Sequence, residues 1–130
     1  MPETYILRRF HSKMRDLPRK QVLASGDGAI SIALKDFPDT VLITKGSAAA
    51  LTLAAPTAGS PARGGHDGMR ITIYSTTAYA HTVTNTTPGF NNLSTSGDVG
   101  TFGAAVGNYL VVEAYNGIWY TVGNLNVTLA

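Results

Sequence analysis

The sequence has no cysteine among its 130 residues, and this absence excludes several kinds of chemistry at once. Disulfide bridges, thiolate ligands for zinc and cysteine nucleophiles all require a residue that is missing here. A small domain without disulfides has to be stabilised by the packing of its core or by association with other subunits.

Charged residues are also scarce, because Asp, Glu, Lys and Arg make up 14% of the chain, against about 25% in ordinary soluble domains. Few charged groups leave few candidates for acid–base catalysis, and they suggest that a partner covers part of the surface. No apolar run approaches the ~20 residues of a membrane-spanning helix. No apolar segment follows the first basic residues, so we expect neither a membrane span nor a signal peptide.

The basic residues are concentrated near the N-terminus. Residues 1–25 contain six basic and two acidic side chains, a net charge of +4, whereas residues 26–130 contain four basic and six acidic side chains, a net charge of −2. A length of 130 residues fits a single domain. We therefore predict an extended basic arm over residues 1–25 and one folded domain over residues 26–130.

The folded domain is predicted to be all-β. Short runs of Val, Ile, Thr and aromatic residues alternate with other residues at a period of two, which is typical of strands. Turn-forming residues separate these runs, and Asn116-Gly117 is the strongest hairpin signal. We predict strands over residues 29–34, 40–44, 50–54, 70–74, 80–85, 99–102, 109–115, 118–122 and 125–129.

Strands of this number and spacing, without a credible long helix, favour an antiparallel β-sandwich of jelly-roll-like arrangement, or a small barrel. Two long connections are expected at residues 56–68 and 86–97, where Gly, Pro, Ala, Ser, Thr and Asn are frequent. Connections of this length lie at the surface, where they are available to a partner.

Metal binding has one weak signal, the His66-Asp67 pair inside a glycine-rich loop. A metal site needs several ligands that converge from rigid elements, and this pair does not supply them. We predict no metal site and interpret the segment as a solvated loop. His81, on a Thr-rich strand, is predicted to face solvent.

Catalytic residues are equally hard to find. No G-x-S-x-G nucleophile motif is present, and Asp27, Asp39 and Asp98 adjoin Gly or Pro, where Asp usually caps a turn. Glu113 interrupts an apolar strand, and we predict that it faces solvent or pairs across the sheet rather than lining a pocket. A lone carboxylate cannot perform glycoside hydrolysis by the two-carboxylate route. The sequence therefore predicts a protein that is not an enzyme and holds no cofactor.

Aromatic residues cluster around the last hairpin, at Tyr109, Tyr115, Trp119 and Tyr120. Because side chains alternate along a strand, Trp119 points away from the face that carries Tyr120. We predict that Trp119 belongs to the core. The alternative is an exposed aromatic platform that stacks on a carbohydrate or on a partner.

The basic arm is the feature most informative about function. It mixes cationic and apolar side chains, which suits a segment that docks in a groove or adds a strand to another subunit. Nucleic-acid contact is a less favoured reading, because Tyr5 and Phe10 with six basic residues form no recognisable binding module. A solubilising tail is a further alternative. The candidates for partner contact are Ile6, Leu7, Arg8, Arg9, Phe10, Arg15 and Arg19.

Two stretches carry a family resemblance. Residues 43–59 read ITKGSAAALTLAAPTAG, and residues 67–77 read DGMRITIYSTT, followed by AHTVT at residues 80–84. This pattern resembles segments of small head proteins of tailed phages, over roughly residues 28–122 of this chain. The arm lies outside it, so the docking role of the arm comes from its residues alone.

The resemblance implies a capsid decoration, or cement, protein. Such proteins are small β domains that bind the outside of the expanded phage head as dimers or trimers and bridge neighbouring subunits of the major capsid protein. The resemblance implies no catalytic residue, cofactor or membrane contact. The rival hypothesis is a carbohydrate- or receptor-binding module of a phage fibre or surface protein, whose site would lie at the Tyr115–Tyr120 hairpin and the loop at residues 86–97.

Overall fold

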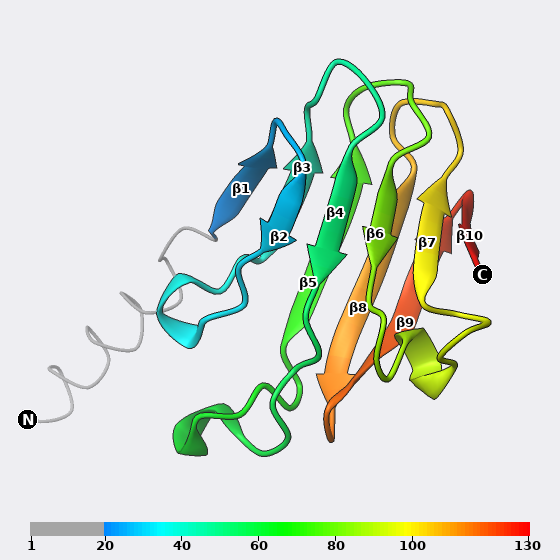
Figure 1. The fold of residues 1–130 in the computed structure, drawn as a ribbon. Helices are drawn as coiled ribbons and strands as arrows, with labels where there is room; N and C mark the ends of the chain where they lie inside the picture. The colour runs from blue at the N-terminus through cyan, green and yellow to red at the C-terminus, as the bar shows by residue number, and fades with distance from the viewer. Residues whose placement is uncertain (1–19) are drawn as a thin grey trace, which may run out of the picture.

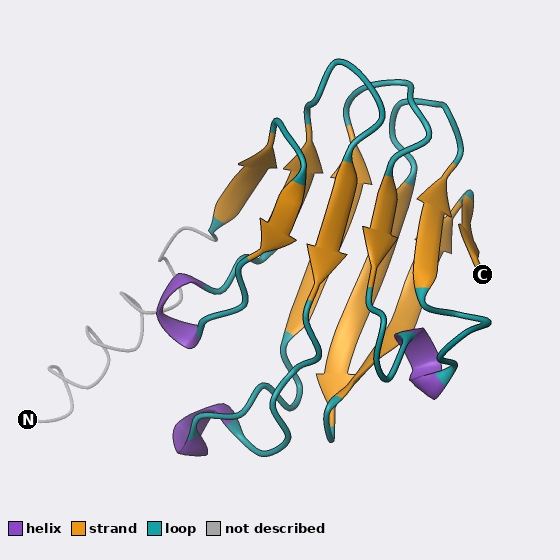
Figure 2. Cartoon of the chain, in the orientation of Figure 1, coloured by secondary structure: helices purple, strands orange, loops and turns teal. Residues whose placement is uncertain are grey.

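The computed structural model describes residues 20–130, which fold into two five-stranded sheets that face each other (Figure 1). Sheet A contains, in spatial order, β1 (Gln21–Ala24), β3 (Thr40–Ile43), β5 (Arg70–Ser75), β8 (Tyr109–Tyr115) and β9 (Ile118–Leu125). Sheet B contains β10 (Val127–Leu129), β7 (Val99–Phe102), β6 (Thr82–Thr84), β4 (Ala50–Leu53) and β2 (Gly28–Ile30). The helical content of residues 20–130 is three short 3₁₀ turns: η1 (Leu34–Asp36), η2 (Pro61–Arg63) and η3 (Phe90–Asn92). Figure 2 colours these turns purple.

The first six strands alternate between the two sheets. β1, β3 and β5 lie side by side in sheet A, while β2, β4 and β6 lie side by side in sheet B. Neighbours within each set are parallel. Each pair, such as β1 followed by β2, is therefore one coil of a chain that winds around a common core, and three such coils are stacked (Figure 1).

This winding corrects one part of the predicted fold. The all-β class and the two-sheet architecture are present, but the sheets are mixed rather than antiparallel. When consecutive strands alternate between the sheets, each strand lies beside the next strand but one, as β1 lies beside β3. Such neighbours run in the same direction. A jelly roll is built from antiparallel neighbours, so the predicted jelly-roll-like topology was wrong for β1 to β6.

The last four strands complete the sheets in the antiparallel sense. β7 pairs with β6 and with β10 in sheet B, while β8 pairs with β5 and with β9 in sheet A. Asn116 and Gly117 connect β8 to β9 with φ values of 50° and 82°. Positive φ at both positions is what a tight two-residue hairpin turn requires, so the predicted hairpin is confirmed.

The core lies between the sheets and is built by alternation along each strand. In β5, Ile71 and Ile73 are fully buried while Thr72 and Tyr74 are partly exposed. The inward side chains of adjacent strands are in register, as in the row of Val41, Ile73 and Leu110. Complete burial of one such aliphatic side chain contributes about 1.5–3 kcal/mol. Apolar rows of this kind hold the two sheets together.

The predicted strands mostly fall where strands are observed, with two exceptions. β1 lies inside the segment assigned to the arm, so the folded part begins before residue 26. The strand predicted over residues 29–34 ends at Ile30, because the chain then leaves sheet B and enters η1. Between residues 20 and 130, no helix is long and apolar enough to cross a membrane.

Candidate functional site

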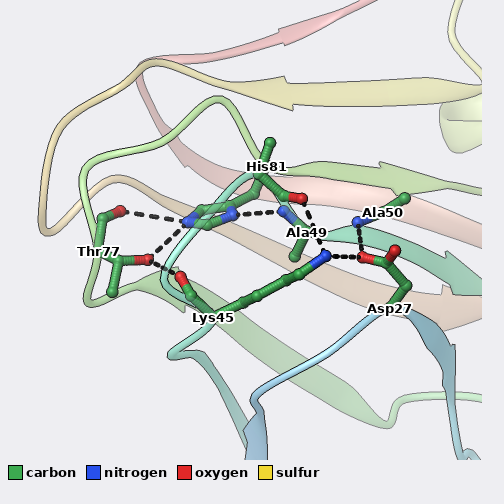
Figure 3. A network of polar contacts seen from close by, with 7 residues as sticks. Asp27, Lys45, Ala49, Ala50, Thr77 and His81 are labelled. Carbon is green, nitrogen blue, oxygen red and sulfur yellow. Dashed lines mark hydrogen bonds and ion pairs between the residues drawn. The ribbon is translucent and has the colours of Figure 1, made fainter.

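Polar side chains gather at the end of the sandwich where β1 turns into β2, β3 into β4 and β5 into β6 (Figure 3). His81 is fully buried there, and its Nδ1 accepts a hydrogen bond from the Ala49 N–H at 2.9 Å. An accepting Nδ1 leaves the proton on Nε2, which lies 3.0 Å from Thr77 Oγ1 and 3.2 Å from the Thr77 carbonyl. The prediction that His81 faces solvent was therefore wrong.

The same contacts continue from the third coil to the first. Thr77 Oγ1 donates to the Lys45 carbonyl at 2.7 Å, and Lys45 Nζ lies 2.8 Å from Asp27 Oδ1. The same carboxylate oxygen accepts the Ala50 N–H at 2.9 Å. Asp27 thus joins two coils, which extends its predicted role as a turn cap (Figure 3). We call this set, from Asp27 through Lys45 to Thr77 and His81, the turn network.

Electrostatics within the turn network favour a charged Asp27. The hydrogen bond from the Lys45 ammonium, followed by that from the Ala50 N–H, lowers the pKa of the Asp27 carboxyl below its ordinary value of 3.8. Its side chain remains 57% exposed, so solvent screens the pair. The arrangement orients the turns, and Asp27 is ionised at neutral pH, as an ordinary solvated carboxylate is.

His66, from the His66-Asp67 pair considered above as a weak metal signal, also proves to be a structural group. Its side chain is buried, its Nδ1 accepts the Thr57 N–H at 2.9 Å, and its Nε2 donates to the Ile32 carbonyl at 2.7 Å. The ring of Phe37 lies 5.7 Å away. The interpretation of this segment as a solvated loop was wrong at His66, because the histidine fastens the long loop to the first coil.

The remaining polar candidates have structural partners as well. Glu113 pairs across the sheet with Arg70, at 2.8 Å between Glu113 Oε1 and Arg70 Nη2. Pairing across the sheet was one of the two arrangements predicted for Glu113. Within residues 20–130, no buried side-chain nitrogen or oxygen lacks a hydrogen-bond partner, and no group of three His, Asp or Glu residues is placed to hold a metal. Asp27, His66, His81 and Glu113 therefore each have a partner within the fold.

The aromatic cluster of the last hairpin is divided between the core and the surface. Trp119 is fully buried, and its Nε1 donates to the Ala54 carbonyl at 2.8 Å, so the prediction of a core tryptophan is confirmed. Tyr115 and Tyr120 are 62% and 37% exposed. Asn91, from the predicted loop at residues 86–97, donates from Nδ2 to Thr121 Oγ1 and accepts the Thr121 N–H. The loop and the hairpin are thus neighbours, as the carbohydrate hypothesis requires.

A row of large apolar side chains crosses the outer face of sheet A. It follows the register of the strands and takes one residue from each: Leu23, Leu42, Tyr74, Tyr109 and Leu125. Residues that are partners in register share one face of a sheet. Leu23 is 62% exposed and Leu125 is 51% exposed, while the other three are partly exposed. At about 4.8 Å per strand, the row is about 19 Å long.

This row, which we call the apolar row, is the candidate binding surface of the described part of the chain. Sequence reasoning missed it, although its members occupy the outward positions of the alternating pattern in β3, β5 and β8. A single outward apolar residue in one strand does not indicate a binding surface, because such residues are common on protein surfaces. Five of them become a surface only when the order of the strands is known.

The predicted partner contacts Ile6, Leu7, Arg8, Arg9, Phe10, Arg15 and Arg19 lie outside the residues that the structure describes. Comparisons of the chain with protein-family models, with curated proteins and with solved structures found no match.

Proposed function

We propose that this protein is a structural component of a tailed-phage head, a decoration or cement protein that binds the outer surface of the shell through the major capsid protein. The observation that carries the proposal is the apolar row on sheet A. The row consists of regularly spaced side chains on strands that are already ordered in a sheet, so docking it costs little backbone entropy. Its work is to bind, without a bond-making step.

The exposure of the apolar row supports a binding role. A monomeric protein seldom exposes a contiguous apolar patch of more than a few hundred Å², and larger patches usually mark interaction sites. Tyrosine is enriched at interfaces because its ring is apolar and its hydroxyl can find a polar partner. Tyr74 occupies the centre of the row with Tyr109 next to it, and contact with a partner would be most complete at the centre.

The sequence resemblance to small phage head proteins, over residues 43–59 and 67–84, directs this binding role to a capsid. A protein that binds only the assembled, expanded shell stabilises the shell by its free energy of binding. A homo-oligomer with several footholds multiplies this effect through effective concentration. The cationic residues Arg8, Arg9, Arg15 and Arg19 would provide a second foothold in addition to the apolar row.

The proposal is tested by adding the purified full chain to expanded heads that lack decoration. We expect the protein to sediment with the heads at a saturating stoichiometry and to raise their melting temperature. Replacing all four arginines by alanine should weaken this binding and make it less dependent on salt, because fewer charged contacts remain to be screened. Heads that neither retain the protein nor melt later would exclude the proposal.

A carbohydrate- or receptor-binding module is the second candidate, favoured by one observation. Tyr115 and Tyr120 are exposed on the last hairpin. The loop at residues 86–97 contacts strand β9 of this hairpin through Asn91. Aromatic faces next to polar loop groups are suited to stacking on sugars. Under this hypothesis, Tyr115→Ala with Tyr120→Ala abolishes binding to a glycan array, whereas the capsid hypothesis predicts no glycan binding to lose.

A further inference from the structure

A groove lies on the outer face of sheet B, at the end where the parallel strands β4 and β6 leave the sheet (the lower end in Figure 1). Its volume is about 420 Å³, and it is lined by Ala29 and by residues 52–55 and 84–87. Ala29, Thr52 and Thr84 are partners in register on β2, β4 and β6. The groove therefore crosses three strands, and its volume falls in the range of about 300–1,000 Å³ of small-molecule sites.

Small side chains leave this part of the face hollow. Ala29, Ala54 and Ala55 are exposed, and each presents only a methyl group. Leu53 and Asn85, which also line the groove, are both 1% exposed. The groove is thus a depression above a closed core, with methyl groups on its surface.

Threonine hydroxyls are the polar groups that the groove offers to a ligand. Within the described part of the chain, none of the hydroxyls in the groove has a hydrogen-bond partner, whereas Thr77 Oγ1 donates to the Lys45 carbonyl. A hydroxyl without a partner can both donate to a ligand and accept from it. Four threonines line the groove: Thr52, Thr84, Thr86 and Thr87.

The buried Asn85 holds the two sides of the groove together. Its Nδ2 donates to the Leu53 carbonyl at the end of β4, at 2.7 Å, and its Oδ1 accepts the Gly89 N–H at 2.9 Å. Its own N–H donates to the Asp98 carbonyl at 2.7 Å. The shape of the groove is therefore set before a ligand arrives, which lowers the entropy that binding costs.

The lining restricts the class of ligand. Among residues 20–130, none of those that line the groove is charged, so the groove offers no counter-charge to an ionic ligand. β4 and β6 have neighbours on both sides, and their backbone groups are engaged in the sheet. A ligand on this face therefore meets free hydroxyls and methyl groups, which suit a neutral molecule that has both hydroxyls and C–H surface.

We propose that this groove binds a neutral carbohydrate. Thr52 and Thr84 form hydrogen bonds with sugar hydroxyls from the sheet, and Thr86 and Thr87 do so from the start of the following loop. The methyl groups of the alanines pack against the C–H faces of the sugar.

This site is separate from the two surfaces considered above. The groove is on sheet B, whereas the apolar row is on the outer face of sheet A, so docking of the row on a shell would leave the groove accessible. Tyr115 and Tyr120 belong to β8 and β9 of sheet A. The capsid hypothesis alone calls for no glycan binding, and the groove adds a property that does not depend on it.

Amide chemical shifts of the isotope-labelled, full-length protein test the proposal. The probes are the neutral sugars maltotriose, lactose and chitotriose, with sialyllactose as an acidic comparison. We expect at least one neutral probe to shift the resonances of residues 52–55 and 84–87 in a saturable way, and the added charge of sialyllactose to bring no gain over lactose.

Two matched variants locate the site. Thr52→Val with Thr84→Val keeps the shape of both side chains and removes their hydroxyls, so it should weaken binding of that sugar at least about tenfold. The control, Thr101→Val with Thr128→Val, changes two partners in register on β7 and β10, outside the groove, and should bind like the parent protein. Thermal denaturation should find both variants folded, because Val and Thr are both good strand formers.

Three outcomes would overturn the proposal. The first is that no neutral probe shifts the resonances of residues 52–55 and 84–87. The second is that the two valine variants bind the sugar equally well. The third is that Tyr115→Ala with Tyr120→Ala abolishes binding while the threonine variants bind normally, which would assign the sugar to the hairpin.

Discussion

The two outer faces of the sandwich are built alike and differ in chemistry. On sheet B, the row in register across four strands consists of Ala50, Thr82, Thr101 and Thr128. On sheet A, the corresponding row across five strands is the apolar row. Threonine is a good strand former that solvates well, so sheet B shows how this fold furnishes an outer face that is suited to water. The fold therefore does not require the leucines and tyrosines of sheet A.

If the apolar row were needed for stability, the two outer faces would not differ in the way described. The largest expected effect is accordingly on the inner face of the same sheet, where Ile73→Ala should lower the free energy of unfolding by about 2–5 kcal/mol through lost burial and the cavity left behind. Tyr74→Thr, at the next residue on the outer face, should cost at most about 1 kcal/mol. Urea denaturation of both variants measures this, and equal losses would remove the distinction between the faces.

A second variant measures how much the turns that join the sheets contribute to stability. His81→Phe keeps a ring in the buried site but leaves the Ala49 N–H without its acceptor, which should cost about 1–3 kcal/mol. Tyr79→Phe, a 42% exposed neighbour, is the matched control and should have the stability of the parent protein. If thermal denaturation finds the two variants equally stable, the turn network does not hold the coils in the way described.

The ion pair between Arg70 and Glu113, elsewhere on the outer face of sheet A, should matter much less. Arg70 and Glu113 retain 57% and 39% exposure of their side chains, and such surface pairs contribute about 0.2–1 kcal/mol, less at high salt. We expect Arg70→Ala to shift the urea midpoint slightly at low ionic strength and not at high ionic strength. A loss above about 2 kcal/mol would mean that sheet A depends on its outer face after all.

The smallest expected effect is the response of the turn network to acid. Because the folded-state pKa of Asp27 is lowered, its contribution is present above the ordinary value of 3.8 and is lost as the pH falls through the folded-state pKa. Asp27→Asn lacks this contribution at every pH. The gap in urea midpoint between parent and variant should therefore narrow on going from about pH 6 to below about pH 3. A constant gap would contradict the pairing with Lys45.

The sequence was sufficient for the strands and insufficient for their order. Alternation in Arg70–Ser75 and Tyr109–Tyr115 identifies strands and the two faces of each. It does not identify the neighbour, because parallel and antiparallel partners leave the same pattern on a single strand. β1 was missed because its alternation is only four residues long and adjoins a basic segment.

The buried histidines were missed for a related reason. His81 sits among threonines, and its acceptor role depends on Ala49, 32 residues away in the sequence. His66 depends in the same way on Ile32, 34 residues away. Imidazole is read as polar until its partners are known. The apolar row is likewise assembled from five strands, so no local pattern can reveal it.

Two matched triple variants test whether the outer face of sheet A binds the capsid. One replaces Leu23, Tyr74 and Leu125 of the apolar row by glutamine, and the other replaces Thr82, Thr101 and Thr128 of sheet B by the same residue. The measurement is the equilibrium binding of each variant to undecorated, expanded heads. We expect the sheet A variant to bind at least about tenfold more weakly than the parent protein, and the sheet B variant to bind like the parent protein. Equal affinity of the two variants would contradict it.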